Sequence, residues 1–102
     1  GVNLNPPRAD VPAGDVGLPY SDPMLSILQQ DWQNMNQAWA AYSGFVQEVD
    51  PGLNAQFLAH WQVLQDQIGI LESGRVGLHD STMLHEWAVW YVSELGRVSW
   101  GG

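Results

Sequence analysis

Residues 21–49, SDPMLSILQQDWQNMNQAWAAYSGFVQEV, decide the fold of this chain. The large apolar residues here recur in alternating steps of three and four, a heptad pattern that keeps one stripe along one side of an α-helix. Such a helix extends for about 43 Å, whereas the radius of gyration of a compact 100-residue domain is about 13 Å. The stretch therefore predicts an elongated helical molecule. The stripe consists of Leu25, Leu28, Trp32, Met35, Trp39, Tyr42, Val46 and Val49.

Two pairs of residues mark helix starts. Asp22 precedes Pro23 and Asp50 precedes Pro51, and in each pair the carboxylate can accept an unpaired amide while proline fits the first turn. Because the link between the first two helices is short, they are expected to form an antiparallel hairpin. The fold class predicted is all-α, a long hairpin with a shorter third helix, within a helical domain of residues 21–96. The predicted helices span residues 22–49, 51–73 and 81–95. The apolar stripe of the second is Leu53, Phe57, Trp61, Leu64, Ile68 and Leu71.

The third helix contains the longest apolar run, Trp87–Val92. A run that is apolar on every side of a helix predicts burial all round. A strand is the alternative, because valine, tryptophan and tyrosine favour strands. A helix is preferred, since Asp80 or Ser81 can cap its start and Gly96 can end it.

Residues 1–20, GVNLNPPRADVPAGDVGLPY, predict an extended arm. Its four prolines lack amide donors and restrict the residues before them, and no helix or strand period is present. The arm is richer in apolar side chains than a flexible tail requires, so it is expected to lie along a groove of another subunit; the alternative is a disordered terminus. A second predicted contact is Trp100 in the C-terminal tail, residues 97–102; the alternative is that Trp100 folds back on the helical bundle. The predicted partner-binding residues are Val2, Leu4, Val11, Val16, Leu18, Tyr20 and Trp100.

The charge balance is strongly acidic. Eleven acidic residues stand against three arginines and no lysine, giving a formal charge of −8. Nucleic-acid binding depends on basic residues, so nucleic acid is not an expected partner. Only 14% of the chain is charged, against about 25–35% on a typical small-domain surface. The helix faces outside the apolar stripes carry glutamine and asparagine in place of charged residues. Their amides can form hydrogen bonds with neighbouring subunits without burying ions. No apolar run approaches the ~20 residues of a membrane span.

The search for catalytic or metal-binding groups finds one polar cluster. His79, Asp80 and Ser81 are contiguous, and neighbours in sequence cannot place a base between a nucleophile and its orienting acid. With His85 and Glu86 they do not share one helix face, so no metal site is predicted. The chain has no cysteine, which excludes disulfides and thiolate ligands. No enzyme activity and no cofactor are predicted, although the sequence leaves open whether the histidines bind anything. These are His60, His79 and His85.

Tyr42, Ser43 and Gly44 near the end of the first helix form an aromatic-x-Gly element. With the chain length, the acidic charge and the lack of cysteine, this resembles the small WXG-type secreted proteins of type VII systems, with tyrosine in place of tryptophan. The likeness covers Ser21–Ser73. It implies a helical hairpin that acts with one protein partner.

The sequence thus predicts a non-catalytic structural or assembly subunit of a larger complex, such as a virion, tail or filament. Its partners would be other protein subunits, reached through the arm and the aromatic helix faces. The alternative is a secreted WXG-like effector or adaptor. No localisation is assigned.

Overall fold

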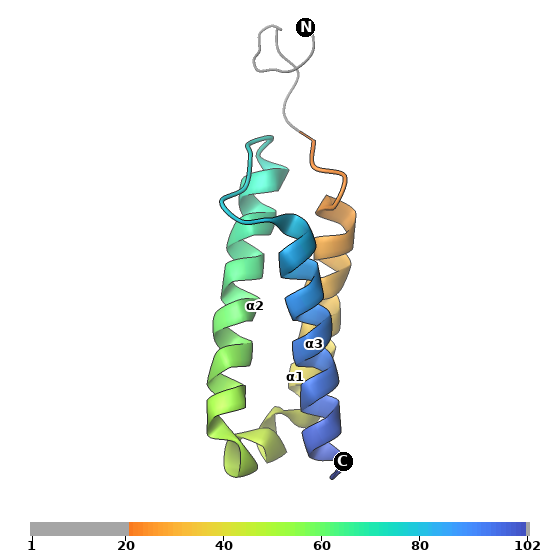
Figure 1. Cartoon of the computed structure of the whole chain (residues 1–102), viewed down its shortest axis with the longest axis vertical. Helices are drawn as coiled ribbons and strands as arrows, with labels where there is room; N and C mark the ends of the chain where they lie inside the picture. The colour runs from red at the N-terminus through yellow and green to blue at the C-terminus, as the bar shows by residue number, and fades with distance from the viewer. Residues whose placement is uncertain (1–20, 102) are drawn as a thin grey trace, which may run out of the picture.

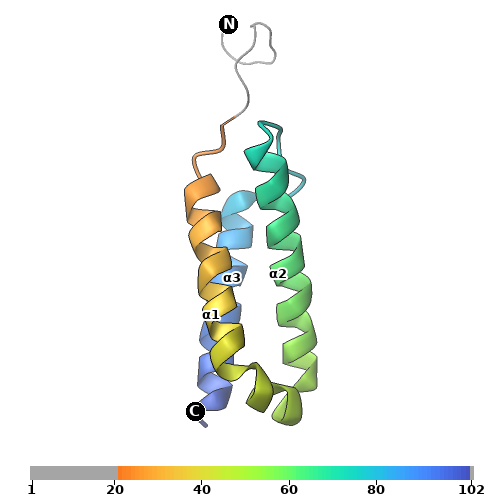
Figure 2. The ribbon, with the colours of Figure 1, turned by 180° about the vertical axis from the view of Figure 1, so that it is seen from behind.

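A computed structural model of the chain describes residues 21–101, and these residues form three α-helices and no strand. α1 spans Leu25–Val49, α2 spans Pro51–Glu72 and α3 spans Ser81–Ser99. α2 runs antiparallel to α1, and α3 returns parallel to α1 (Figures 1 and 2). The described part is a rod with extents of 53 × 17 × 17 Å. The predicted elongated all-α fold is confirmed, whereas the predicted arm lies outside the described residues.

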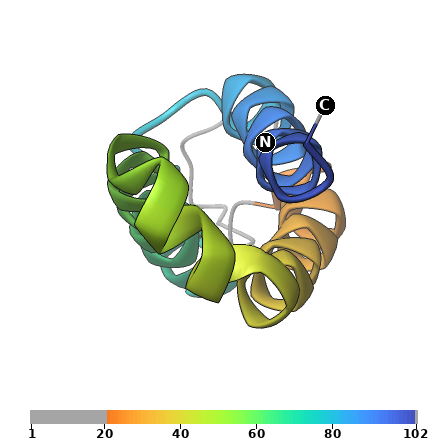
Figure 3. The same ribbon diagram turned by 90° about the horizontal axis from the view of Figure 1, so that it is seen from below.

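α1 is the helix on which the other two pack. It contacts α3 most extensively and α2 next, while α2 and α3 share the smallest contact. Seen along the rod, α1 and α3 lie close together and α2 stands further from α3 (Figure 3). The pairing of α1 with α3 is therefore as important as the predicted hairpin.

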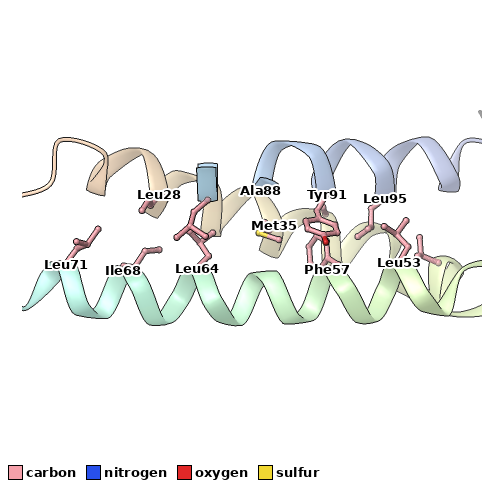
Figure 4. Packing of buried hydrophobic residues seen from close by; sticks show 13 residues of the cluster. Leu28, Met35, Leu53, Phe57, Leu64, Ile68, Leu71, Ala88, Tyr91 and Leu95 are labelled. Carbon is pink, nitrogen blue, oxygen red and sulfur yellow. The ribbon is translucent and has the colours of Figure 1, made fainter. Parts of the chain in front are cut away.

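The core fills the space between α2 and the other two helices (Figure 4). The predicted stripe of α2 faces inward as expected: all its members are buried except Trp61, which is partly buried. Each fully buried leucine, isoleucine or phenylalanine side chain contributes about 1.5–3 kcal/mol relative to an exposed one. The buried apolar residues are Leu28, Met35, Ala38, Val46, Leu53, Phe57, Leu64, Ile68, Leu71, Leu84, Ala88, Tyr91 and Leu95.

The heptad stripe of α1 is buried less evenly than predicted. Leu28 and Met35 are fully buried, but Val49 at the end of the stripe is exposed. Asp31 and Ala38, which lie outside the stripe, are buried as well. The reason is that α1 contacts two helices, so its buried face is wider than a single seam. The last turns of α1 also bend across the base of the rod towards α2 (Figure 2), as serine and glycine pairs in a helix allow.

The predicted caps at Asp50 and Asp80 are confirmed. Oδ1 of Asp50 accepts the amide of Leu53 (3.1 Å), and Oδ1 of Asp80 accepts the amide of Met83 (3.2 Å). The predicted cap at Asp22 is wrong, because the N-cap position of α1 is Met24 and Oδ1 of Asp22 accepts the amide of Met24 (2.8 Å) and not one inside the helix. α1 consequently begins later than residue 22.

The helix ends depend on glycines with positive φ. Gly74 (φ 79°) follows α2, and its amide bonds to the carbonyl of Leu71 (3.0 Å), which closes the helix in a Schellman-type end. The prediction that Gly96 ends the third helix is wrong. α3 continues to Ser99, and the glycine with positive φ after it is Gly101 (φ 76°).

A buried glutamine joins the α2–α3 loop to the helices. Gln67 is 1% exposed. Its carboxamide accepts the amide of His79 (3.1 Å) and donates to the carbonyl of the same residue (2.7 Å) and to Oγ of Ser81 (3.2 Å). Ser81 in turn donates to Oδ2 of Asp22 (2.7 Å). This polar cluster, made of Asp22, Gln67, His79 and Ser81, fixes the starts of α1 and α3 relative to α2.

Gln67→Ala should lower the free energy of unfolding by about 2–3 kcal/mol, because it leaves buried donors and acceptors of the loop without partners. The control is Gln65→Ala, since Gln65 is exposed on the same helix, and this change should stay within about 0.5 kcal/mol of the wild type. Urea unfolding followed by helical circular dichroism measures both. Equal effects of the two substitutions would contradict the structural role of the cluster.

Gly77→Ala should also destabilise the fold, because a Cβ at this position would overlap the carboxamide of Gln67. We expect a loss of about 1–3 kcal/mol. Gly69→Ala is the control, since a Cβ there meets nothing within 4 Å and alanine favours a helix. In a Gln67→Ala background the cost of Gly77→Ala should largely disappear. Additive losses in the double variant would exclude the contact.

Candidate protein-interaction site

The outer face of α3 carries exposed tryptophans. The predicted all-round burial of Trp87–Val92 is wrong: Trp87 is 47% and Trp90 is 45% exposed, while Ala88 and Tyr91 face the core. The cause is the small contact between α2 and α3, which leaves one side of α3 uncovered. A large apolar surface left exposed on a small protein commonly marks an interaction site.

These tryptophans line a broad groove between α2 and α3, called here the tryptophan groove. Its lining residues are Gln56 of α2 and Glu86, Trp87 and Trp90 of α3, and its volume is about 610 Å³. Pockets that bind small molecules have volumes of about 300–1,000 Å³. The groove combines two indole rings with one carboxylate and one carboxamide.

A chain of aromatic contacts supports the groove from behind. The rings of Trp87 and Trp90 meet edge to face at 6.0 Å, and both contact Tyr91, at 5.9 and 5.0 Å. Tyr91 packs against Phe57 of α2 at 6.4 Å and against His60 at 5.4 Å. Edge-to-face and tilted ring pairs add stabilisation beyond burial alone. The exposed indoles are therefore held by the core and are not free side chains on a surface.

The electrostatics of the groove favour a cation. Glu86 is exposed, and the two arginines within residues 21–101 are engaged elsewhere. Arg97 forms a paired contact with Glu94 (2.7 and 2.9 Å), and Arg75 donates to the hydroxyl of Ser73 (3.0 Å). Indole faces attract cations, and tryptophan does so more strongly than tyrosine or phenylalanine.

The structure places only one of the predicted partner-binding residues. Trp100 directly follows α3, is 80% exposed, and its Nε1–H donates a long hydrogen bond to the hydroxyl of Tyr42 (3.4 Å). It thus touches the bundle while most of its ring is open to solvent. The tryptophan groove was not among the predicted sites, although the apolar run that forms it was recognised. The predicted residues outside the described part are Val2, Leu4, Val11, Val16, Leu18 and Tyr20.

A buried acid, Asp31, forms a second polar feature that the sequence reasoning missed. Asp31 is 4% exposed, and Oδ2 of its carboxylate accepts a hydrogen bond from Nδ1 of His85 (2.8 Å). Burial raises the pKa of Asp31, and the bond to His85 offsets part of that rise. The pair lies beside a shallow hollow of about 160 Å³ between α1 and α3, lined also by Asn34 and Ser93. The sequence held one signal for the burial of Asp31: it lies three residues after Leu28, and residues three apart lie on the same side of a helix.

The other histidines have structural contacts. Nε2 of His60 donates to the carbonyl of Leu84 (3.1 Å), and burial lowers the pKa of His60. Backbone groups of His79 bond to Gln67. Within residues 21–101, no three histidine, aspartate or glutamate side chains come close enough together to hold a metal ion. In the same part of the chain, no helix is both long and apolar enough to span a membrane.

Comparison of the chain with family models, with curated proteins and with solved structures found no match. The resemblance of Tyr42, Ser43 and Gly44 to WXG-type proteins stays a prediction.

Stability should fall with acidification because of His60. Since the pKa of this histidine is lowered in the folded state, the unfolded chain binds a proton first as pH drops below the ordinary value of 6.5. Stability from this group is therefore complete above pH 6.5 and lost progressively below it. His60→Gln should show a smaller decrease in unfolding free energy between pH 7.5 and 5.5 than the wild type.

Urea unfolding at each pH measures this difference. Asp31 acts in the opposite direction, because a raised carboxyl pKa makes the folded state gain a proton first. Comparing the wild type with His60→Gln at the same pH cancels most of the contribution of Asp31. Gln65→Ala is the control for the effect of a surface substitution. Parallel pH profiles of the wild type and His60→Gln would contradict the prediction.

Proposed function

We propose that this protein is a non-catalytic assembly subunit that packs against further copies of itself through the tryptophan groove. The observation that carries the proposal is the half-exposure of Trp87 and Trp90 on a firmly packed aromatic base. Tryptophan is enriched among the residues that dominate binding energy in protein interfaces. A partner that covers both indoles would remove a large apolar area from water.

Other exposed apolar side chains support repeated packing. Phe45 and Val49 lie in the last turns of α1, and Trp100 contacts Tyr42 near the same end. At the opposite end, the α2–α3 loop exposes Val76 and Leu78. A rod with apolar groups on one side and at both ends has several surfaces on which neighbours can pack.

The use of the polar side chains also supports a non-catalytic role. Asp80 caps α3, Ser81 donates to Asp22, and His85 pairs with Asp31. These are the residue types from which a catalytic site would be built. In this chain their described contacts hold helices together.

The proposal predicts that the mass of the full chain rises with concentration in size-exclusion chromatography with light scattering. Trp87→Gln combined with Trp90→Gln should shift the chain towards monomer and weaken association by about tenfold or more, because both anchors are lost. Val89→Gln is the matched control, since Val89 is half-exposed on the same helix but does not line the groove. Helical circular dichroism should be unchanged in both variants.

A wild-type chain that stays monomeric at every concentration would refute self-association. A defined one-to-one complex with a different protein, formed by a chain that does not self-associate, would favour the WXG-like adaptor instead. Equal loss of association in the control and the double tryptophan variant would show that the groove is not the contact.

A further inference from the structure

We propose that the tryptophan groove binds residues 5–12, NPPRADVP, from the N-terminal segment of a second copy of the chain. The inference rests on the proposed self-association and names what fills the groove. The segment lies outside the described residues, and the residue types in its sequence match the groups that line the groove.

The first match is between proline and indole. Adjacent prolines favour an extended polyproline II conformation, which loses little entropy on binding and docks in grooves lined by aromatic rings. Trp87 and Trp90 stand edge to face, with 76° between their planes. They therefore form two walls at a wide angle, against which the compact apolar rings of Pro6 and Pro7 can pack.

The second match is between charges. Arg8 directly follows the two prolines and is, besides Arg75 and Arg97, the remaining arginine of a chain whose formal charge is −8. Glu86 lies in the groove beside the indoles. A guanidinium group can stack on an indole and bond to a carboxylate at once, which an ammonium group does less well.

The third match is between backbone and side chain. A polyproline II segment leaves its carbonyl groups without internal hydrogen bonds. The exposed carboxamide of Gln56, on the α2 side of the groove, is a donor for such a carbonyl. The two prolines, Arg8 and a backbone carbonyl of the segment thus each have a counterpart in the groove, whereas Asp10 has none there.

The reach of the segment allows the contact between copies. The hydrogen bond from Ser81 to Asp22 places the start of α1 beside the start of α3, and Trp87 follows about 9 Å along α3. Residues 13–20 span up to about 28 Å when extended, and the rod is 17 Å wide. The segment can therefore cross to a neighbouring rod. The same length permits closure onto its own groove, so the experiment must separate these two sources.

Mixing two full-length variants separates them. The first is Trp87→Gln with Trp90→Gln, which lacks the groove but keeps the segment. The second is Pro6→Ala, Pro7→Ala and Arg8→Ala, which lacks the segment's motif but keeps the groove. Each variant alone should be largely monomeric by light scattering, and an equimolar mixture should form a mixed complex, because the segment of the first fits the groove of the second.

A second measurement tests recognition directly. A fluorescently labelled peptide of residues 1–12 is titrated into the segment variant, whose own motif is disabled. We expect saturable binding that weakens about tenfold with Glu86→Gln or with an Arg8→Ala peptide, and that also weakens as salt is raised. Val89→Gln in the segment variant is the control and should bind as before.

The outcomes separate the two proposals. Variants that are each monomeric and stay so when mixed would overturn binding between copies, and peptide binding would then assign the groove to the chain's own segment. Self-association that persists in the segment variant, without peptide binding, would overturn the inference and leave the proposed function intact. A wild-type chain that never self-associates would refute both. Complementation together with peptide binding would establish the inference.

Discussion

The fold depends on α1 having a buried face wide enough for two helices. Leu28 and Met35 face the common core, and Asp31 and Ala38 extend the buried surface beyond the predicted stripe. Because α2 and α3 both pack on this one helix, they have little contact with each other. The opening between them is the tryptophan groove. The exposed indoles of α3 are thus a direct consequence of how α1 distributes its apolar residues.

The polar cluster around Gln67 determines where that groove lies. Its carboxamide holds the loop at His79, and Ser81 links the start of α3 to Asp22. These hydrogen bonds fix the position of α3 along the axis of the rod relative to α1 and α2. The packing of leucine side chains is too unspecific to fix that position alone. The aromatic contacts of Tyr91 with Phe57 then fix the rotation of α3. Position and rotation together decide that the indoles line the same groove as Gln56.

Local chemistry made much of the fold predictable. Asp50 and Asp80 were recognised as caps because a cap needs only the amides of its own helix. The end at Gly96 was wrong because whether a helix stops at a glycine depends on what packs beyond it, and Val98 packs against the core. The buried Gln67 lay beyond prediction for a related reason: a polar side chain is buried only where another segment supplies its partners. The apolar run around Trp87 did not reveal that this residue is exposed, because its exposure depends on how closely α2 packs against α3.

The balance between charge and apolar surface shapes what the molecule can bind. A formal charge of −8 on 102 residues opposes indiscriminate association of like rods, because every approach brings negative charges together. Apolar contact between copies is then favourable only where enough area is buried at once, or where a cation lowers the repulsion locally. In the tryptophan groove, Trp87 and Trp90 supply the apolar area. Glu86 supplies a carboxylate to which a cation of the neighbouring copy can bind. In a chain with three arginines and no lysine, the position of each arginine therefore has a large influence on which surfaces can meet.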